Sequence, residues 1–290
     1  MMSKLTLSRL QLLVSPRSRV APPGSAVATE TNVGRGDLAA RSDLFVLGCG
    51  RSGTSLAAGL FRDAGFFMGH KLHAPRPSNQ KGFFEDEEIN HLNDAMVARL
   101  LPDRSALAVP GYGYDVPDNR QHWLSRVPLS TRAAATGDEI ERIRILTGNK
   151  PFCFKDPRFS YTLDVWRCFA NRPKFICVFR EPATFVSSVF AECLSQPYLH
   201  NLAISVEQLL DVWVTMYRHI LDRHARAGDW IFVEYDDLVV GRGLRRLEAF
   251  TGVAVDSGFA DGALNHSRPI IKVPRAVSEV LEELRARKGD

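Results

Sequence analysis

The stretch LFVLGCGRSGTSL, Leu44–Leu56, decides the fold, because it leads from an apolar run through glycines into a helical pattern. A continuous apolar run bounded by glycine is typical of a strand buried on both faces of a parallel sheet. Gly48, Gly50 and Gly53 allow backbone N–H groups to curl around an anion. A helix expected over 54–64 would direct its positive dipole end to the same place. The stretch therefore predicts a strand, an anion-binding loop and a helix.

The spacing of Gly48 and Gly53 is that of a P-loop, but Thr54 precedes Ser55 where that motif requires a lysine. Arg51, Thr54 and Ser55 offer instead a forked cation and two hydroxyl groups, which suit a phosphate or a sulfate. The alternative is a glycine-rich turn that serves only tight packing. The missing lysine argues against a nucleoside triphosphate bound with magnesium.

Beyond this stretch the chain alternates strand-like and helix-like patterns, with structure expected to start near Asp43. Short apolar runs predict strands at 152–154, 174–179 and 230–235, and helical patterns follow near 160–170, 182–194 and 236–250. This order predicts an α/β fold, a three-layer sandwich with a central parallel sheet flanked by helices. Ligands of such sheets bind at the carboxyl ends of the strands, so the candidate site lies there.

A second cation closes one of these strands. Arg180 follows the run 174–179, and Ser187 and Ser188 lie about two turns into the next helix. A separation of seven or eight residues returns a serine to the same helical face, so arginine and serine could bind one further phosphate. Taken alone the pair is unspecific, because a solvated helix cap would show the same residues.

Length and charge favour one soluble domain. With 290 residues and 45% hydrophobic content the chain can bury a sizeable core, expected as a single domain over 43–290 after a flexible tail over 1–42. The segment 101–123, rich in proline and glycine, is expected to be a substrate-loop insertion. Six basic against two acidic residues in the tail account for the whole net charge of +4. A neutral domain argues against a nucleic-acid partner.

Cysteine usage and hydropathy point to the cytoplasm. The five cysteines form no C-x-x-C pair and stand mostly in apolar surroundings, so we expect buried free thiols in a reducing compartment. No segment approaches the roughly 20 apolar residues of a membrane helix. Residues 1–29 have the composition of a transit peptide as well as of a disordered tail, and we expect the tail.

Several stretches together resemble one family. GCGRSGTSL resembles the 5′-phosphosulfate loop of sulfotransferases that use 3′-phosphoadenosine 5′-phosphosulfate (PAPS), with Arg51 nearest the carbohydrate and tyrosyl-protein types. FICVFREPATFVSSV resembles their 3′-phosphate element, in which Ser188 follows the arginine by eight positions. FCFKDPRFSYTLDVW, WIFVEYDDLV and KGFFEDEEINHLND are similar to further segments of bacterial members. The resemblance spans about 44–284.

The resemblance implies the P-loop-NTPase-like sulfotransferase fold and in-line transfer of a sulfuryl group from PAPS to a hydroxyl or amine. The acceptor would be a small molecule, a glycan or a glycolipid, adenosine 3′,5′-bisphosphate would leave, and no metal would be needed. The donor-binding residues that it implies are Gly50, Arg51, Ser52, Gly53, Thr54, Ser55, Arg180 and Ser188, with His266 and Arg268 from a late loop.

The same resemblance suggests catalytic roles. Arg51 would neutralise the leaving phosphate, and Lys155 would reach the bridging oxygen or the sulfuryl group, unless it merely pairs with Asp156. Glu85 would be the base that removes the acceptor proton. Its alternative is a carboxylate in the acidic first turn of a helix over 86–99.

Further polar and aromatic residues are candidates for the acceptor side. His70 and His73 are competing bases in a loop, and they lack the third ligand that a zinc site would need. Tyr112 and Tyr114 in the long insertion could stack on a sugar or an aromatic acceptor, and 193–201 is a second candidate lid.

Two other functions stay open. In a P-loop kinase, Asp236 and Asp237 would bind magnesium at a strand end, although both suit the cap and first turn of a helix. A nucleotide-binding protein that has lost its base is the other alternative. The sequence indicates no oligomeric state.

Overall fold

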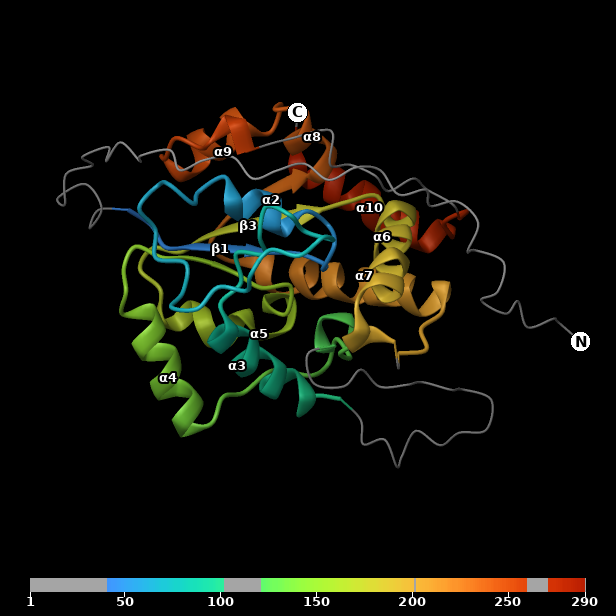
Figure 1. Ribbon diagram of the computed structural model, residues 1–290, viewed down its shortest axis with the longest axis horizontal. Coiled ribbons are helices and arrows are strands. Elements are labelled where there is room, and N and C mark those ends of the chain that lie inside the picture. Colours follow the sequence, from blue (N-terminus) through green and yellow to red (C-terminus); the bar gives the residue numbers. More distant parts are fainter. Residues whose placement is uncertain (1–40, 102–120, 201, 260–270, 290) are drawn as a thin grey trace, which may run out of the picture. The chain divides into compact units, whose positions relative to one another are not determined.

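The computed structural model describes residues 41–101, 121–200, 202–259 and 271–289 (Figure 1). Within these ranges four parallel strands form one sheet in the order β2-β1-β3-β4, which confirms the α/β class. The strands are β1 (Leu44–Leu47), β2 (Cys153–Lys155), β3 (Lys174–Phe179) and β4 (Asp229–Glu234). The expected tail lies outside the described residues except for its last two, and so do residues 102–120 of the expected insertion.

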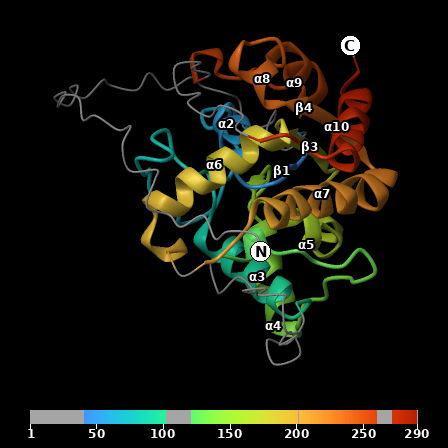
Figure 2. The same ribbon diagram turned by 90° about the vertical axis from the view of Figure 1, so that its right-hand side faces the viewer.

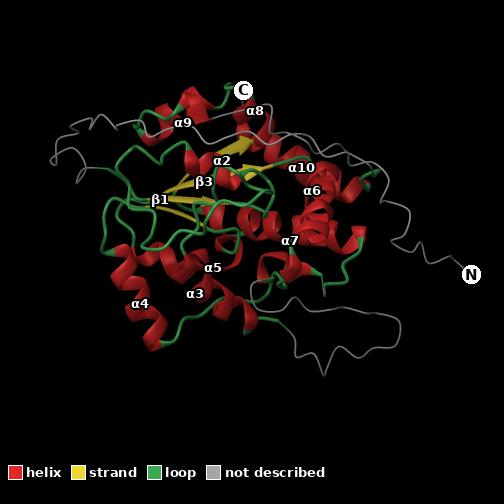
Figure 3. Cartoon of the chain, viewed as in Figure 1, coloured by secondary structure: helices red, strands yellow, loops and turns green. Residues whose placement is uncertain are grey.

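Helices fill the connections between the strands and make up most of the chain after β4 (Figure 3). They are α2 (Thr54–Gly59), α3 (Glu87–Ala98), α4 (Gly137–Thr147), α5 (Phe159–Trp166), α6 (Pro182–Ser195), α7 (Val206–Asp222), α8 (Tyr235–Val239), α9 (Leu244–Thr251) and α10 (Arg275–Lys288). Three predicted helices are shorter than expected, one of them α5, which ends at Trp166 and is followed by a 3-10 turn. The helix expected over 54–64 ends at Gly59, because the next residues form successive i−3 turns, and Gly241, with a φ of 78°, interrupts the one expected over 236–250.

Alternate strand residues face opposite helical layers. Phe45 and Leu47 pack in one core cluster with α3, α5, α7 and α10, whereas Leu44 and Val46 pack in a second with α2, α8 and α9. Figures 1 and 2 both place α2, α8 and α9 on one face of the sheet and α3, α5 and α7 on the other. The sheet is therefore buried on both faces, which explains why its strands read as continuous apolar runs.

The cysteines follow the expectation only in part. Cys49, Cys153 and Cys177 are buried free thiols, and burial raises their pKa values. Cys193 is half-buried and Cys168 is exposed, so the expectation of buried thiols is wrong for Cys168. Cys168 lies in the short 3-10 helix Arg167–Phe169 that follows α5, where no side chain is buried.

Gly48 allows the backbone to turn sharply at the end of β1. Its φ is 135°, and a Cβ there would lie 2.1 Å from the carbonyl oxygen of Val178 in β3. The Tyr217 hydroxyl, from α7, donates to the same oxygen at 2.8 Å and accepts from the Cys49 N–H at 3.3 Å. Glycine thus lets the loop start directly against β3, where α7 fixes it.

Gly48→Ala should lower the free energy of unfolding by about 2–4 kcal/mol, because the positive φ and the overlap with a strand oxygen both cost energy. Gly137→Ala is the matched control, since a Cβ at this α4 position meets no atom within 4 Å. We expect that control to change stability by less than about 0.5 kcal/mol. Urea unfolding measures both, and equal stabilities would contradict this account of the loop.

Candidate functional site

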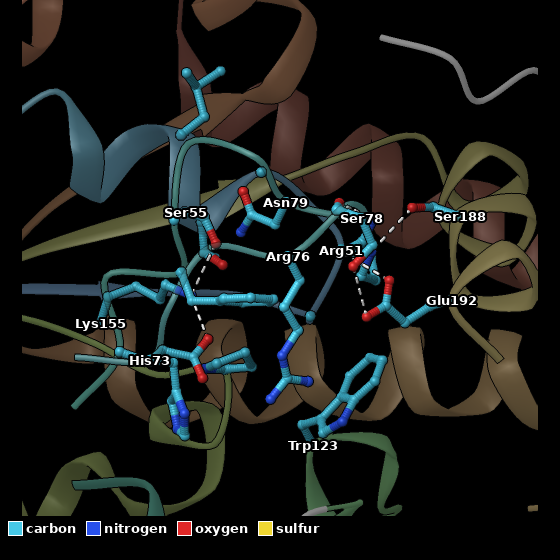
Figure 4. A pocket seen from close by; sticks show the side chains of 18 of the residues that line it. Arg51, Ser55, His73, Arg76, Ser78, Asn79, Trp123, Lys155, Ser188 and Glu192 are labelled. Atoms are coloured by element: carbon cyan, nitrogen blue, oxygen red, sulfur yellow. Dashed lines mark hydrogen bonds and ion pairs between the residues drawn. The ribbon is translucent and has the colours of Figure 1, made fainter. Parts of the chain in front are cut away.

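A cavity of about 830 Å³ lies at the carboxyl ends of β1, β2 and β3. Its wall combines the loop after β1 with segment 73–85 and with residues of α3 and α6, and Figure 4 shows their side chains converging. Sequence-predicted site residues in the wall are Gly50, Arg51, Gly53, Thr54, Ser55, His73, Glu85, Lys155, Arg180 and Ser188. Residues that lie far apart in the chain therefore share one space.

The loop after β1 contributes Gly50, Arg51 and Gly53 to the cavity wall. Gly53, with a φ of 94°, precedes α2, and no side chain caps the first turn of that helix. A Cβ on Gly53 would lie 2.3 Å from the Tyr235 ring, so glycine also allows α8 to pack against the loop. Ser52 differs from the expectation: its side chain is buried outside the wall, and its N–H donates to the Cys49 carbonyl oxygen at 3.1 Å.

Arg51 joins the loop to α6. Its Nε donates to Ser188 Oγ at 3.2 Å, and its Nη1 lies 3.3 Å from a carboxylate oxygen of buried Glu192. Ser78 completes the cluster, because its hydroxyl donates to Glu192 at 3.1 Å and its carbonyl oxygen accepts from Arg51 Nη2 at 3.2 Å. The two predicted phosphate elements are thus neighbours that share one guanidinium.

Arg180 is a buried cation at the end of β3. Only 6% of its surface is exposed, and its guanidinium carbon lies 4.2 Å from the centre of the Tyr235 ring. Trp213 Nε1 donates to its carbonyl oxygen at 3.1 Å, which fixes the backbone. Burial lowers the pKa of Arg180, and the charge of Arg51 adds to the effect. A bound anion would offset this cost of keeping the guanidinium charged.

Lys155 ends β2 and forms a buried ion pair with Glu85, while its Nζ also donates to Ser55 Oγ at 3.1 Å. The alternative pairing of Lys155 with Asp156 is wrong, because the Asp156 carboxylate faces Arg158. Ser55 brings the first turn of α2 into the same contact. The ammonium group therefore lies between the loop and Glu85.

Glu85 does not belong to the first turn of α3. Asp86 is the N-cap and accepts from the N–H groups of Glu88 and Ile89, so Glu85 precedes the helix. Burial raises the pKa of Glu85, but the cations Lys155 and Arg158 outweigh burial and hold the pKa below its usual value. Glu85 is thus an ionised carboxylate that contacts an ammonium in the cavity wall.

Buried Asp156, the residue after Lys155, accepts hydrogen bonds from several side chains near this ion pair. It accepts from the backbone and guanidinium of Arg158, and from the side-chain amides of Asn90 and Asn93. Since the Asn90 amide nitrogen donates to Asp156, its oxygen faces His73 Nε2, at 2.9 Å. An amide oxygen only accepts, so Nε2 carries the proton and Nδ1 of the neutral ring is an acceptor.

Of the two loop histidines, only His73 lies in the cavity wall. His73 is in the cavity wall, whereas His70 is exposed outside it, with its ring 4.8 Å from that of Phe67. The expectation that His70 shares the site is therefore wrong. Among the described residues no group of three or more His, Cys, Asp or Glu could hold a metal ion.

Four predicted acceptor and donor residues belong to segments that the structure does not describe. Tyr112, Tyr114, His266 and Arg268 lie outside the described residues. Trp123, an aromatic residue of the expected substrate-loop insertion, lines the cavity, and so does Tyr198 from the second candidate lid. Further polar, aromatic and charged lining residues, which sequence reasoning did not assign, include Arg76, Asn90, Asp94, Glu192 and Tyr235.

The acidic end of β4 faces away from the cavity. Glu234 accepts from Arg285 at 2.6 Å and from Lys288 at 2.9 Å, and Asp237 accepts from Lys288 at 2.8 Å. None of these residues is in the cavity wall. Asp236 and Asp237 occupy the first turn of α8, as their alternative reading expected. This strand end therefore holds α10 in place.

Comparison with family models identifies one family. A family model described as "Sulfotransferase family" matches residues 43–257. A search of curated protein sequences found no significant match.

One similar solved structure is the sulfotransferase domain from the Synechococcus PCC 7002 olefin synthase, with 18% identity and a TM-score of 0.44 over 86% of this chain and 94% of that chain. Another is the sulfotransferase domain from the curacin biosynthetic pathway, with 14% identity and a TM-score of 0.49 over 84% of this chain and 98% of that chain. A sulfotransferase from Alicyclobacillus acidocaldarius is similar at 14% identity, with a TM-score of 0.43 and 86% and 94% covered. At these TM-scores we draw nothing further from the likenesses.

Proposed function

The chain belongs to the sulfotransferase family, and we propose that it transfers a sulfuryl group from PAPS to a hydroxyl or amine of a glycan, a glycolipid or a small natural product. The observation that carries the proposal is the meeting of Arg51, Arg180 and Lys155 around one cavity that lacks a P-loop lysine. Two separate cationic centres suit a donor with a 3′-phosphate and a 5′-phosphosulfate.

The residues of the cavity fit both anionic groups of PAPS. Arg180 and Ser188 would hold the 3′-phosphate, because a buried guanidinium and a hydroxyl from the next helix line the same cavity. The amides of the loop, with Thr54 and Ser55, would hold the 5′ side. Arg51 lies 3.2 Å from Ser188 and links the two halves.

PAPS would supply the sulfuryl group, with adenosine 3′,5′-bisphosphate as the second product. Lys155 would stabilise negative charge on the leaving phosphate, since its ammonium is fixed beside Ser55. Glu85 would take the proton from the acceptor. When Glu85 takes this proton, its carboxylate loses its negative charge and its ion pair with Lys155 weakens. The Lys155 ammonium could then interact with the leaving phosphate as that phosphate gains negative charge.

The base can be identified from a pH profile. Because the pKa of Glu85 is lowered, its basic form persists throughout the neutral range, and kcat/KM should stay flat down to about pH 4.5. A histidine base would instead give an acidic limb near pH 6.5, about the pKa of an ordinary imidazole. Release of adenosine 3′,5′-bisphosphate from radiolabelled PAPS, with an acceptor or with water, measures the profile. A limb near neutrality would contradict the assignment to Glu85.

The same assay separates the alternatives. A kinase would use ATP and stop when magnesium is chelated, whereas sulfuryl transfer should continue in a chelator. A protein that only binds the nucleotide would show no turnover in either condition. Transfer of labelled sulfur to any acceptor, or to water, supports the proposal directly.

We also propose a cytoplasmic location. All five cysteines are free thiols, which suits a reducing compartment. None of the described helices is long and apolar enough to cross a membrane.

A further inference from the structure

We propose that the acceptor is an anion and that Arg76 binds its negatively charged group. The inference rests on the proposed function, because it assigns a further residue in the wall of the same cavity. It narrows the acceptor from any hydroxyl or amine compound to one that also carries a carboxylate, phosphate or sulfate.

Aromatic rings orient the Arg76 side chain. The guanidinium carbon lies 5.5 Å from the centre of the Phe83 ring and 5.9 Å from that of Tyr198. Figure 4 shows the side chain extending between His73 and Trp123. An arginine against ring faces is held by them yet keeps its N–H groups available to an oxyanion.

Arg76 is an exposed cation of the cavity wall that has no carboxylate partner among the described residues. The wall holds six basic side chains, Arg51, Arg76, Lys81, Lys155, Arg158 and Arg180, and four carboxylates, Glu85, Glu87, Asp94 and Glu192. Each of these carboxylates forms an ion pair, with Lys155, Lys71, Arg158 and Arg51 respectively. In the described ranges no carboxylate pairs with Arg76, while Lys81 donates to the Phe259 carbonyl oxygen and Arg180 is assigned to the donor. An anionic ligand would complete this balance.

The backbone fixes Arg76 relative to the donor residues. Arg76 and Asn79 exchange two backbone hydrogen bonds, at 3.2 and 2.8 Å, which close a turn. Ser78 in that turn contacts both Arg51 and Glu192. Because the backbone makes the turn, a change of the Arg76 side chain should leave the fold and the donor residues intact. Trp123 and Tyr198 offer flat surfaces for the body of the ligand.

Matched probes test the proposal on the full-length protein saturated with adenosine 3′,5′-bisphosphate. We would compare hydroxyphenylacetate with hydroxyphenylacetamide, and hydroxyphenylpropionate with its amide, by ligand-observed NMR titration. The two members of each pair have nearly the same shape, but only the acid carries a negative charge. The variant is Arg76→Gln, and the control is Arg62→Gln, an arginine that lies 4.8 Å from the Phe259 ring centre outside the cavity wall. Binding of the bisphosphate is measured separately for all three proteins.

The wild type and Arg62→Gln should bind the acids about fivefold or more tightly than the amides, a preference that Arg76→Gln loses and that salt weakens. Equal binding of acids and amides by the wild type, including no binding of either, would overturn the inference, as would a preference that survives in Arg76→Gln. If the wild type binds the bisphosphate, such a result leaves the proposed function standing. Failure to bind the bisphosphate overturns both.

Discussion

Lys155→Met should lower kcat for transfer from PAPS by about 10²–10³-fold, the loss typical when one fixed donor to a developing negative charge is removed. Lys155 is buried at the end of β2, where its ammonium contacts Glu85 and Ser55. Methionine keeps the length and the packing of the side chain but removes the charge. Binding of adenosine 3′,5′-bisphosphate through Arg180 should change little by comparison.

A second variant separates catalysis from folding. Removal of Lys155 leaves Glu85 without its cation, and breaking such a buried pair costs about 3–5 kcal/mol of stability. The double variant Lys155→Met/Glu85→Gln removes both charges of this pair, so it should be more stable than the single variant, yet at least as slow because it also lacks the proposed base. Urea unfolding and single-turnover rates measure the two effects. A kcat within tenfold of wild type in a folded Lys155→Met protein would refute the assigned role.

Arg180→Ala should weaken the binding of adenosine 3′,5′-bisphosphate by about 100-fold or more, because a buried guanidinium forms strong charge-assisted hydrogen bonds to phosphate. Adenosine 5′-monophosphate lacks the 3′-phosphate, so its weaker binding should change by less than about threefold. The difference between the two nucleotides isolates the contact with the 3′-phosphate.

Arg167→Ala is the matched control for this variant. Its guanidinium carbon also lies against a ring, 4.9 Å from the centre of Phe175, but outside the cavity wall. We expect this control to bind both nucleotides as the wild type does. An equal loss for both nucleotides in Arg180→Ala would show that Arg180 acts on the fold or on the 5′ side, and would remove it from the 3′-phosphate site.

The strands of the sheet could be predicted from the sequence, because burial on both faces leaves an apolar run between turn residues. β3 spans 174–179 as predicted, and β4 is displaced by one residue. The helices α4 and α7 were missed, although both carry capping boxes, Thr136 with Glu139 and Ser205 with Gln208. These local signals could have revealed them.

Candidate site residues could be predicted from the sequence only where they directly follow a strand. The residues after β1, β2 and β3 stood out because polar side chains followed apolar runs. The ion pair of Lys155 with Glu85 joins residues 70 positions apart, and no spacing rule contains that contact. Arg76 and His70 lie in an irregular segment, so neither periodicity nor residue type could tell which of them faces the cavity.

Calorimetric titration of the wild-type protein with adenosine 3′,5′-bisphosphate, and separately with ATP and magnesium, tests the central claim most directly. The account predicts binding of the bisphosphate without any metal, and at most weak binding of ATP. Two phosphate-binding elements without a P-loop lysine are the reason. Preference for ATP with magnesium, or binding of neither nucleotide, would contradict a PAPS-dependent sulfotransferase.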